Sequence, residues 1–524
     1  MTDVPATVLS APQPQARRWP FLVAGAVAVA VAIAVGEIAA GLFGGAPSLV
    51  LAIGSLVIDL QPAGAKELVV SLFGTNDKLA LNIVILVVAL TIGGLLGLVA
   101  RTSFTRAAAA FMVFGAVALF ASLRLGLDSP FLSVLTVALA VGAAILTLRR
   151  LVDAAEGRVA ASVPSSSMPD WDRRRFLILS GSLAAGAIVV GSVGRALLQG
   201  SRSEAPASLS LPASGLSPAP LTPDISLPVE GITPIVVPND RFYRIDTALI
   251  VPRVNVATWS LTLSGMVERE VSLTFDELAA MSIFEQYVTI ACVSNEVGGD
   301  LVGNALWRGV HLREVLALAG VKPEASQIVG RSVDGFTVGF PTAWAMDPAR
   351  DPMIVLGMNG ELLPIEHGYP ARLIVPGLYG YVSATKWLAE IELTTLDAFD
   401  AYWIPRGWAK EAPILTQSRI DVPRNGAAVS VGPLAIAGVA WAPDRGVSKV
   451  EVRVDGGEWL PATQSTEISN ATWVQWRRGW DATPGDHAIA VRATDGRGEV
   501  QTEQQSPPAP DGARGYHTIR VRAN

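Results

Sequence analysis

One stretch decides the fold of the central part of this chain: HGYPARLIVPGLYGYVSATKW (His367–Trp387). It contains a short strand pattern, a glycine-rich turn and a following segment with Ser and Lys. Backbone N–H groups in such a turn, together with Arg and Lys side chains, suit a phosphate-bearing cofactor. Glycine also lets the main chain approach a ligand closely. The stretch therefore favours a cofactor site, although a glycine-rich loop alone is a weak signal.

Two other stretches make this interpretation more specific. One is NDRFYR (Asn239–Arg244), and the other is TIACVSNEVGG (Thr289–Gly299), which holds the only cysteine of the chain. A strand-like segment, Gln286–Cys292, ends in that cysteine, and a polar loop containing glycine follows it. A single cysteine is most often a small buried hydrophobic residue, so Cys292 alone predicts little. Together with the glycine-rich turn it favours a bound cofactor.

In these residues the sequence resembles the sulfite oxidase family of molybdenum enzymes over about residues 231–400. The resemblance implies an α+β molybdopterin domain in which one Cys thiolate, here Cys292, binds molybdenum beside the dithiolene of molybdopterin, a soft ligand for such a metal. It also implies a cofactor-binding set and a catalytic set. The cofactor-binding set comprises Asn239, Phe242, Tyr243, Cys292, Ser326, His367, Arg372, Ser383 and Lys386, and the catalytic set comprises Cys292, Arg244, Tyr243 and Tyr381.

Arg244 stands where eukaryotic sulfite oxidases carry a substrate-facing Arg, and Tyr243 and Tyr381 could donate hydrogen bonds or protons. The chemistry implied is two-electron oxygen-atom transfer on a small oxo-anion or sulfur compound. In animal and plant sulfite oxidases the cysteine is followed by Ala-Gly-Asn-Arg-Arg, whereas Glu296 stands in the corresponding loop here. The Asn-x-x-Phe-Tyr stretch also resembles bacterial protein-methionine-sulfoxide reductases. A reductase of sulfoxides or other oxo compounds is therefore an alternative, and a non-catalytic membrane receptor is a second one.

The last part of the chain predicts a β-sandwich. Alternating segments such as Leu434–Ala440, Lys449–Asp455 and His487–Ala493 are separated by turn residues, as in two-sheet all-β domains. The segment GVSKVEVRVDGG (Gly446–Gly457) resembles the immunoglobulin-like dimerisation domain of the same family, which implies a homodimer. A sandwich with a purely adhesive role is the alternative.

Composition indicates a membrane part followed by a soluble part. The chain has 524 residues, of which 50% are hydrophobic and only 16% charged, against about 25% charged in ordinary soluble domains. Residues 1–200 carry 14 Lys and Arg against 10 Asp and Glu, and residues 201–524 carry 26 against 36. An acidic soluble part argues against nucleic acid as a partner. One cysteine and four histidines, none before His311, argue against an intrachain disulfide, an iron–sulfur cluster or a haem bound by this chain.

Five apolar runs are each long enough to cross a bilayer as a helix. They are Phe21–Phe43, Leu79–Ala100, Ala107–Leu123, Phe131–Leu148 and Phe176–Val193. Arginines gather at one side of these runs, which predicts a cytoplasmic N-terminus. Five crossings then place the soluble part outside the cytoplasm, anchored in the plasma membrane. Residues 47–73 are ambiguous, and we interpret them as an interfacial or re-entrant segment.

The segment DRRRFL (Asp172–Leu177) resembles a twin-arginine export signal, and a plain cluster of positive charge is the alternative. The expected order is thus an all-α transmembrane bundle (residues 1–165), a signal-anchor helix (170–198) and a Pro/Ser-rich linker (199–230). The α+β molybdopterin domain (231–400) and the immunoglobulin-like β-sandwich (401–524) follow. With molybdenum as the only predicted redox centre, the enzyme needs a separate electron-transfer partner, such as a cytochrome or a quinone-linked protein.

Overall fold

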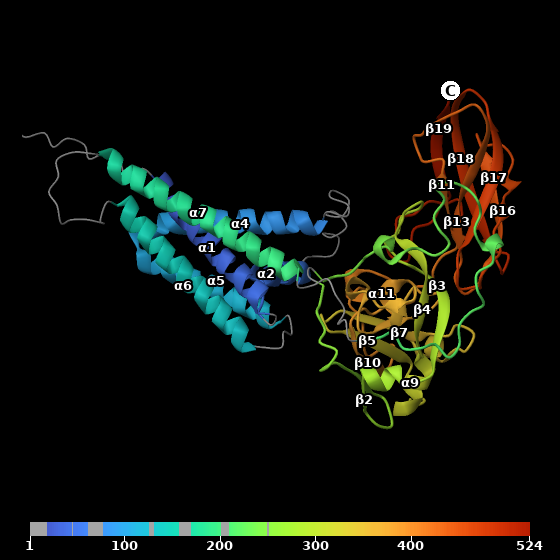
Figure 1. Ribbon diagram of the computed structural model, residues 1–524, viewed down its shortest axis with the longest axis horizontal. Coiled ribbons are helices and arrows are strands. Elements are labelled where there is room, and N and C mark those ends of the chain that lie inside the picture. Colours follow the sequence, from blue (N-terminus) through green and yellow to red (C-terminus); the bar gives the residue numbers. More distant parts are fainter. Residues whose placement is uncertain are drawn as a thin grey trace, which may run out of the picture. The chain divides into compact units, whose positions relative to one another are not determined.

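The computed structural model describes residues 18–43, 46–60, 77–124, 130–156, 169–200, 209–248 and 251–524 (Figure 1). The chain divides into two compact units, Met1–Arg202 and Ser203–Asn524. The first unit is helical and the second is rich in β-sheet, as the composition of the two parts predicts.

The first unit consists of apolar helices. Five of them are long and apolar enough to cross a membrane, and each contains most of one predicted apolar run. A shorter apolar helix covers the first part of the ambiguous segment, whereas residues 61–73 lie outside the described part of the chain. The helices are α1 (Trp19–Leu42), α2 (Leu49–Asp59), α4 (Asp77–Thr102), α5 (Phe104–Leu123), α6 (Pro130–Ala155) and α7 (Pro169–Gly200).

A buried carboxylate joins three of these helices. Glu37 of α1 is only 5% exposed. The hydroxyl of Ser48, the residue that caps α2, donates a hydrogen bond to this carboxylate. Arg195 of α7 donates a second one, with an N–O distance of 3.3 Å. An unpaired charge would be costly among apolar helices, so these two contacts tie α2 and α7 to α1.

The second unit begins with an α+β domain that contains two sheets. One sheet has the strand order β2-β1-β10-β5-β6, and the other has the order β3-β4-β7-β8 with β9 also paired to β7. All pairings are antiparallel except that of β1 with β10. The strands are β1 (Ser260–Gly265), β2 (Val271–Thr274), β3 (Ile283–Ala291), β4 (Val302–His311), β5 (Gln327–Ser332), β6 (Thr337–Pro341), β7 (Met353–Met358), β8 (Glu361–Leu362), β9 (Arg372–Ile374) and β10 (Leu388–Thr394).

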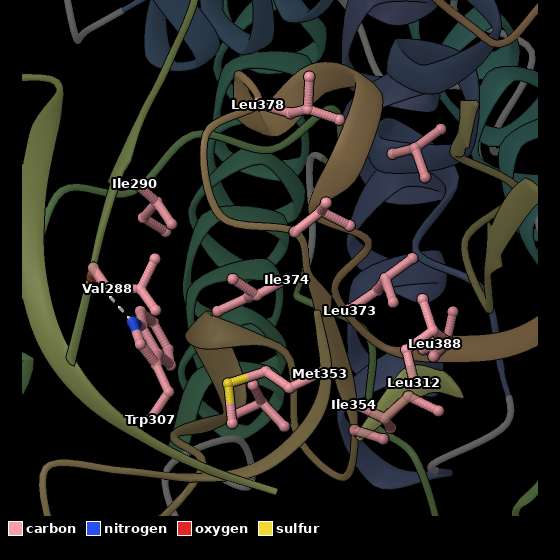
Figure 2. Close-up of a cluster of buried hydrophobic side chains, with 14 of the residues drawn as sticks. Val288, Ile290, Trp307, Leu312, Met353, Ile354, Leu373, Ile374, Leu378 and Leu388 are labelled. Carbon is pink, nitrogen blue, oxygen red and sulfur yellow. Dashed lines mark hydrogen bonds between the residues drawn. The ribbon is translucent and has the colours of Figure 1, made fainter. Parts of the chain in front are cut away.

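Short helices connect these strands: α8 (Phe275–Ala279), α9 (Leu312–Ala319), α10 (Thr342–Met346) and α11 (Gly380–Ser383). Helix α8 begins with a capping box, in which Thr274 and Glu277 exchange hydrogen bonds between side chain and backbone. A buried core fills the space between the elements (Figure 2). One of its tryptophans, Trp307, is fully buried and donates its indole N–H to the Val288 carbonyl at 3.1 Å. The core thereby fixes β3 and β4, the two strands that flank the cysteine loop.

The C-terminal part is a two-sheet β-sandwich (Figure 1). The strand orders are β11-β13-β17-β16 and β12-β19-β18-β14-β15, and one buried apolar cluster draws residues from both sheets. The strands are β11 (Gln417–Val422), β12 (Ala428–Val429), β13 (Gly432–Trp441), β14 (Val447–Val454), β15 (Leu460–Pro461), β16 (Thr463–Gln464), β17 (Val474–Ala482), β18 (Gly485–Asp495) and β19 (His517–Ala523).

The segment before the α+β domain differs from the expected linker. Residues 201–208 lie outside the described part of the chain, but residues 209–230 pack on the folded domains. Leu216 forms a parallel bridge with Phe284 of β3, and Ile225 is 7% exposed within the main core. Leu227 donates its N–H to the Gln475 side chain at 2.6 Å. A Ser/Pro-rich composition suits a spacer, but here isolated apolar residues find buried positions that composition does not reveal.

Candidate active site

Cys292 opens a closed hairpin loop between β3 and β4. Ala291 and Val302 form the last residue pair of these strands, so residues 292–301 make the connection. The Cys292 N–H donates to the Leu301 carbonyl at 2.9 Å, and Leu301 in turn donates to the Asn295 side chain at 2.8 Å. The sulfur of Cys292 is half-buried and lies 2.9 Å from the hydroxyl oxygen of Ser294. The strand end therefore presents the sulfur from a constrained backbone.

Tyr243 lies within electrostatic reach of both this sulfur and Arg372. Burial raises the pKa of Tyr243 above its ordinary value, the negative charge of a Cys292 thiolate adds to that effect, and the Arg372 guanidinium opposes it. Arg372 begins β9, is 5% exposed and lies over the Trp307 ring at 5.3 Å. Burial lowers its pKa to about 10, so it remains a cation at neutral pH. The site thus combines a sulfur, a protonated phenol and a buried positive charge.

His367 is neutral and offers one unused nitrogen. It is 2% exposed, and burial, followed by the nearby Arg372, lowers its pKa to about 4. Its Nε2 lies 3.0 Å from the Asn239 carbonyl, which can only accept, so Nε2 carries the proton. The Nδ1 atom is then an acceptor, and it is buried without a hydrogen-bond partner among the described residues.

Asn239 and Phe242 support this arrangement from the other side. The Asn239 amide oxygen accepts from the Asn359 side chain at 2.8 Å, which holds the Asn239 backbone beneath His367. Phe242 is 5% exposed and stacks on Tyr243 with ring centroids 5.3 Å apart. Its edge also meets the ring of His367 at 5.7 Å. The Asn-x-x-Phe-Tyr stretch therefore lies against the His367 region.

Lys386 and Arg244 share one carboxylate. The Lys386 ammonium donates to Asp246 at 3.3 Å and to the Glu366 carbonyl at 3.0 Å. Burial lowers the pKa of Lys386 to about 8, and Asp246 opposes that effect. Arg244 donates to the same carboxylate at 2.9 Å, but its side chain is 42% exposed. Lys386 therefore faces the interior of the site, and Arg244 lies at its solvent edge.

Several buried polar atoms in the quoted stretch have no hydrogen-bond partner among the described residues. They are His367 Nδ1, Tyr369 Oη, Arg372 Nε and Thr385 Oγ1. Buried polar atoms in folded proteins are nearly always paired, so a cluster of exceptions calls for an explanation. Donors and an acceptor within one stretch fit a polar bound group such as a pterin with its phosphate.

Two of the predicted residues, Ser383 and Tyr381, donate their hydroxyl groups to backbone carbonyls. Ser383 directs its hydroxyl to the carbonyls of Leu378 and Tyr379, at 3.3 and 3.0 Å. Tyr381 donates its hydroxyl to the Ala409 carbonyl at 2.6 Å, and nothing in the described structure couples it to Cys292.

Ser326 lies apart from the other site residues. It is exposed, and its hydroxyl accepts from the Leu396 N–H at 3.0 Å. It precedes the first residue of β5, whereas Leu388, two residues after Lys386, pairs with Ser332 at the other end of that strand. Six residues of strand separate the ends by about 20 Å. We therefore do not include Ser326 in the site.

The structure adds Tyr379 and Arg514, which the sequence did not single out. Burial raises the pKa of Tyr379 to about 12, and the Cys292 charge adds to the rise, which places this phenol near the sulfur. Arg514 of the sandwich also acts on Tyr379 through its charge and pairs with Asp511 at 2.7 Å. Tyr379 lies inside the quoted stretch, so the sequence offered both tyrosines that flank Gly380 as candidate site residues. Nothing in the local sequence points to Arg514.

Comparisons with known proteins concern the domain that carries these residues. Residues 248–403 match the family model described as the oxidoreductase molybdopterin binding domain. A nitrate reductase [NADH] 1 of Oryza sativa subsp. japonica is 27% identical over 318 residues, covering 48% of this chain and 34% of that enzyme. The mitochondrial sulfite oxidase of Homo sapiens is 27% identical over 320 residues, covering 52% of this chain and 58% of that enzyme.

Among solved structures, the sulfane dehydrogenase SoxCD of Paracoccus pantotrophus matches with a TM-score of 0.49 and 23% identity. The match covers 58% of this chain and 86% of that one. The chain therefore spans about a third to a little over half of the first curated relatives that it matches. The domain match and these relatives indicate an oxidoreductase with a molybdopterin-binding domain.

Proposed function

We propose that this chain is a membrane-anchored, extracytoplasmic molybdenum oxidoreductase of the sulfite oxidase type. One observation carries the proposal: Tyr243 interacts electrostatically with both Cys292 and Arg372, and Arg372 belongs to a stretch whose buried polar atoms have no hydrogen-bond partner among the described residues. Among the described residues no group of three or more His, Cys, Asp and Glu could hold a metal. A metal bound to Cys292 would therefore depend on an organic group for further ligands, and the dithiolene of molybdopterin is such a group.

In this proposal Cys292 is the protein ligand of molybdenum, and the stretch from His367 to Lys386 holds the pterin. His367 Nδ1 would accept a hydrogen bond, and the Arg372 and Lys386 cations would bind the phosphate. Asn239 and Phe242 would keep His367 oriented. Ser383 would act on the backbone before α11 and not on the ligand directly. The bound cofactor would supply two-electron oxygen-atom transfer.

The residues around the sulfur would bind and orient the substrate. Tyr243 and Tyr379 have raised pKa values and stay protonated at neutral pH, so each phenol can donate a hydrogen bond. The exposed Arg244 at the edge of the site would attract an anion. Tyr381, which bonds to Ala409, would support the wall of the site and not touch substrate.

The proposed reaction is oxidation of a small oxo-anion or sulfur compound. The substrate gains one oxygen atom from water and releases two electrons and two protons. The alternative is the reverse reaction on a sulfoxide or another oxo compound, favoured by Glu296 in the loop after Cys292. That carboxylate is exposed, so solvent screens its charge and an anion is not excluded by it.

The same proposal covers location and partners. The five apolar helices would anchor the enzyme in the lipid of the plasma membrane, with the second unit outside the cytoplasm. Electrons would pass to or from a separate partner, a cytochrome or a quinone-linked protein. The sandwich would be the immunoglobulin-like module that joins two chains into a homodimer, and nucleic acid would have no role.

The experiment is molybdenum and pterin analysis of the full chain purified in detergent, followed by assays in both directions with artificial electron acceptors and donors. We expect about one molybdenum per chain in the wild type, and loss of both metal and activity in Cys292→Ser. A matched control is Ser326→Ala, which should keep both. A wild-type protein without molybdenum, after production together with cofactor synthesis, would contradict the proposal and favour the non-catalytic receptor.

A further inference from the structure

The C-terminal sandwich bears directly on the cysteine loop. Arg419 of β11 donates through Nη1 to the Gly299 carbonyl at 2.8 Å. The imidazole of His517, at the start of β19, packs on Gly298 so closely that an added Cβ would lie 2.3 Å from its Cδ2 atom. Gly298 has φ +79°, a conformation that suits glycine. Both contacts fall in the second half of the connection between β3 and β4.

The strand that leads to Cys292 is also held by the sandwich. Thr289 of β3 is fully buried and donates its N–H to the Ala471 carbonyl at 2.9 Å. Its hydroxyl accepts the N–H of Trp473 at 2.8 Å. The sandwich therefore contacts the chain three residues before Cys292 and again six and seven residues after it.

Arg419 joins the cysteine loop to two other parts of the chain through one guanidinium group. It is 8% exposed and uses three donors on three partners. Besides Gly299, it donates through Nε to Asp421 at 2.7 Å and through Nη2 to the Thr233 hydroxyl at 2.8 Å. A planar guanidinium can serve three fixed acceptors at once, whereas an ammonium is a single point charge on a flexible stem.

His517 is fixed in a matching way. Its Nδ1 accepts the N–H of Ile420 at 2.9 Å, so this nitrogen carries no proton. Burial lowers the pKa of His517 to about 4, which keeps the ring neutral where it covers Gly298. Ile420 is the neighbour of Arg419 in β11, so one strand of the sandwich orients both groups.

The loop needs such support because Val293 is the only one of its side chains in the main buried core. Residues 292–301 comprise one Cys, Leu and Ser, two Val, two Gly, and Asn, Glu and Asp. A loop with little buried apolar surface opens readily, whereas a metal ligand must be held within about 0.5 Å of its working position by its surroundings. We infer that Arg419 and His517 are positioning residues that hold the loop after Cys292 and so fix the place of its sulfur.

The contacts that carry this inference are present in the chain itself. Only their effect on catalysis rests on the proposed function. The inference can be tested without the cofactor, since Cys292 is the only cysteine. The rate of iodoacetamide alkylation of the full chain then reports on this one sulfur. The chain is produced without cofactor synthesis, purified in detergent, and compared as wild type, Arg419→Lys and His517→Ala.

The matched control is Arg313→Lys. Arg313 pairs with Asp351 beyond His311, at the end of β4 opposite to Val302 and the cysteine loop. Ten residues of strand place it about 33 Å away. This change removes a guanidinium from the α+β domain that carries the loop, without touching the loop itself. Thermal unfolding midpoints of all variants report on general stability separately.

Loss of a hydrogen bond from a charged donor changes a local equilibrium by about tenfold. We therefore expect alkylation of Cys292 to be about tenfold faster in Arg419→Lys, faster also in His517→Ala, and unchanged in Arg313→Lys. In the cofactor-loaded protein, amide hydrogen exchange of residues 293–301 should rise in the first two variants only. Alkylation and exchange equal to wild type in Arg419→Lys would overturn the inference. Absence of molybdenum from the wild-type protein would contradict the proposed function. The alkylation rates of the cofactor-free variants would still test this inference.

Discussion

Replacing Arg372 by methionine should weaken cofactor binding and yet leave the cofactor-free chain at least as stable as wild type. The fall in the pKa of Arg372 from its ordinary value to about 10 corresponds to about 3 kcal/mol of unfavourable free energy for the buried cation. Because this cation has a folded pKa below its ordinary value, the penalty is present in full at neutral pH and begins to fall only above about pH 10, where the folded chain loses the proton before the unfolded chain does.

The substitution also removes favourable contacts. Arg372 donates to the His367 carbonyl at 3.3 Å and lies over the Trp307 ring at 5.3 Å. These contacts together are worth about 2 kcal/mol. The net change for the cofactor-free chain is then about 1 kcal/mol in favour of the variant, by difference. With cofactor bound, the lost charge-assisted hydrogen bonds should weaken affinity by about tenfold or more.

The assay is thermal unfolding of wild type and Arg372→Met, each with and without cofactor. We expect the midpoint of the cofactor-free variant to equal or exceed that of wild type by about 2 °C. The order of the two proteins should reverse once both are loaded. A cofactor-free variant destabilised by more than about 2 kcal/mol would refute the reasoning, because Arg372 would then stabilise the fold and not a ligand.

Three further predictions address charge, local structure and topology. Cofactor affinity should be constant below about pH 8 and fall at higher pH, because the pKa of Lys386 in the cofactor-free chain is about 8 and only its charged form attracts phosphate. In cofactor-release measurements the Lys386→Met variant should bind the cofactor more weakly than wild type and should lack this pH dependence. Thr274→Ala removes the capping box of α8 and should lower the free energy of unfolding by about 1 kcal/mol, measured by denaturant titration; an effect near zero would mean that the cap is dispensable. A reporter fused after Asn524 that functions only outside the cytoplasm should be active, and activity of a cytoplasmic reporter instead would reverse the proposed orientation.

The sequence predicted local elements well where a short-range pattern fixes them. The strand-like segment Gln286–Cys292 lies in β3 up to Ala291, and the alternating segment Leu434–Ala440 lies within β13. Thr274 caps α8 through its side chain, three residues before Glu277. Such elements depend on the alternation of apolar residues and on capping side chains, which lie within a few positions of one another.

The site was predictable only in part. The quoted stretch brings His367, Arg372 and Lys386 into one region because short turns connect them. Spacing could not show which of Tyr379 and Tyr381 faces the sulfur, because Tyr379 precedes and Tyr381 lies within a helix of only four residues that begins at Gly380. One turn of helix is too short for a periodic pattern to show which side chain faces the sulfur.

The sequence by itself determined the five apolar helices, the α+β and β-sandwich parts, and the single sulfur available to a soft metal, because composition and short-range periodicity carry that information. Only the tertiary structure decided that Arg419 and His517 reach the cysteine loop, and that Ser326 lies at the far end of β5. Arg419 and Gly299 are separated by 120 positions. Contacts over such separations are set by how two sheets pack, and no local pattern in the chain records them.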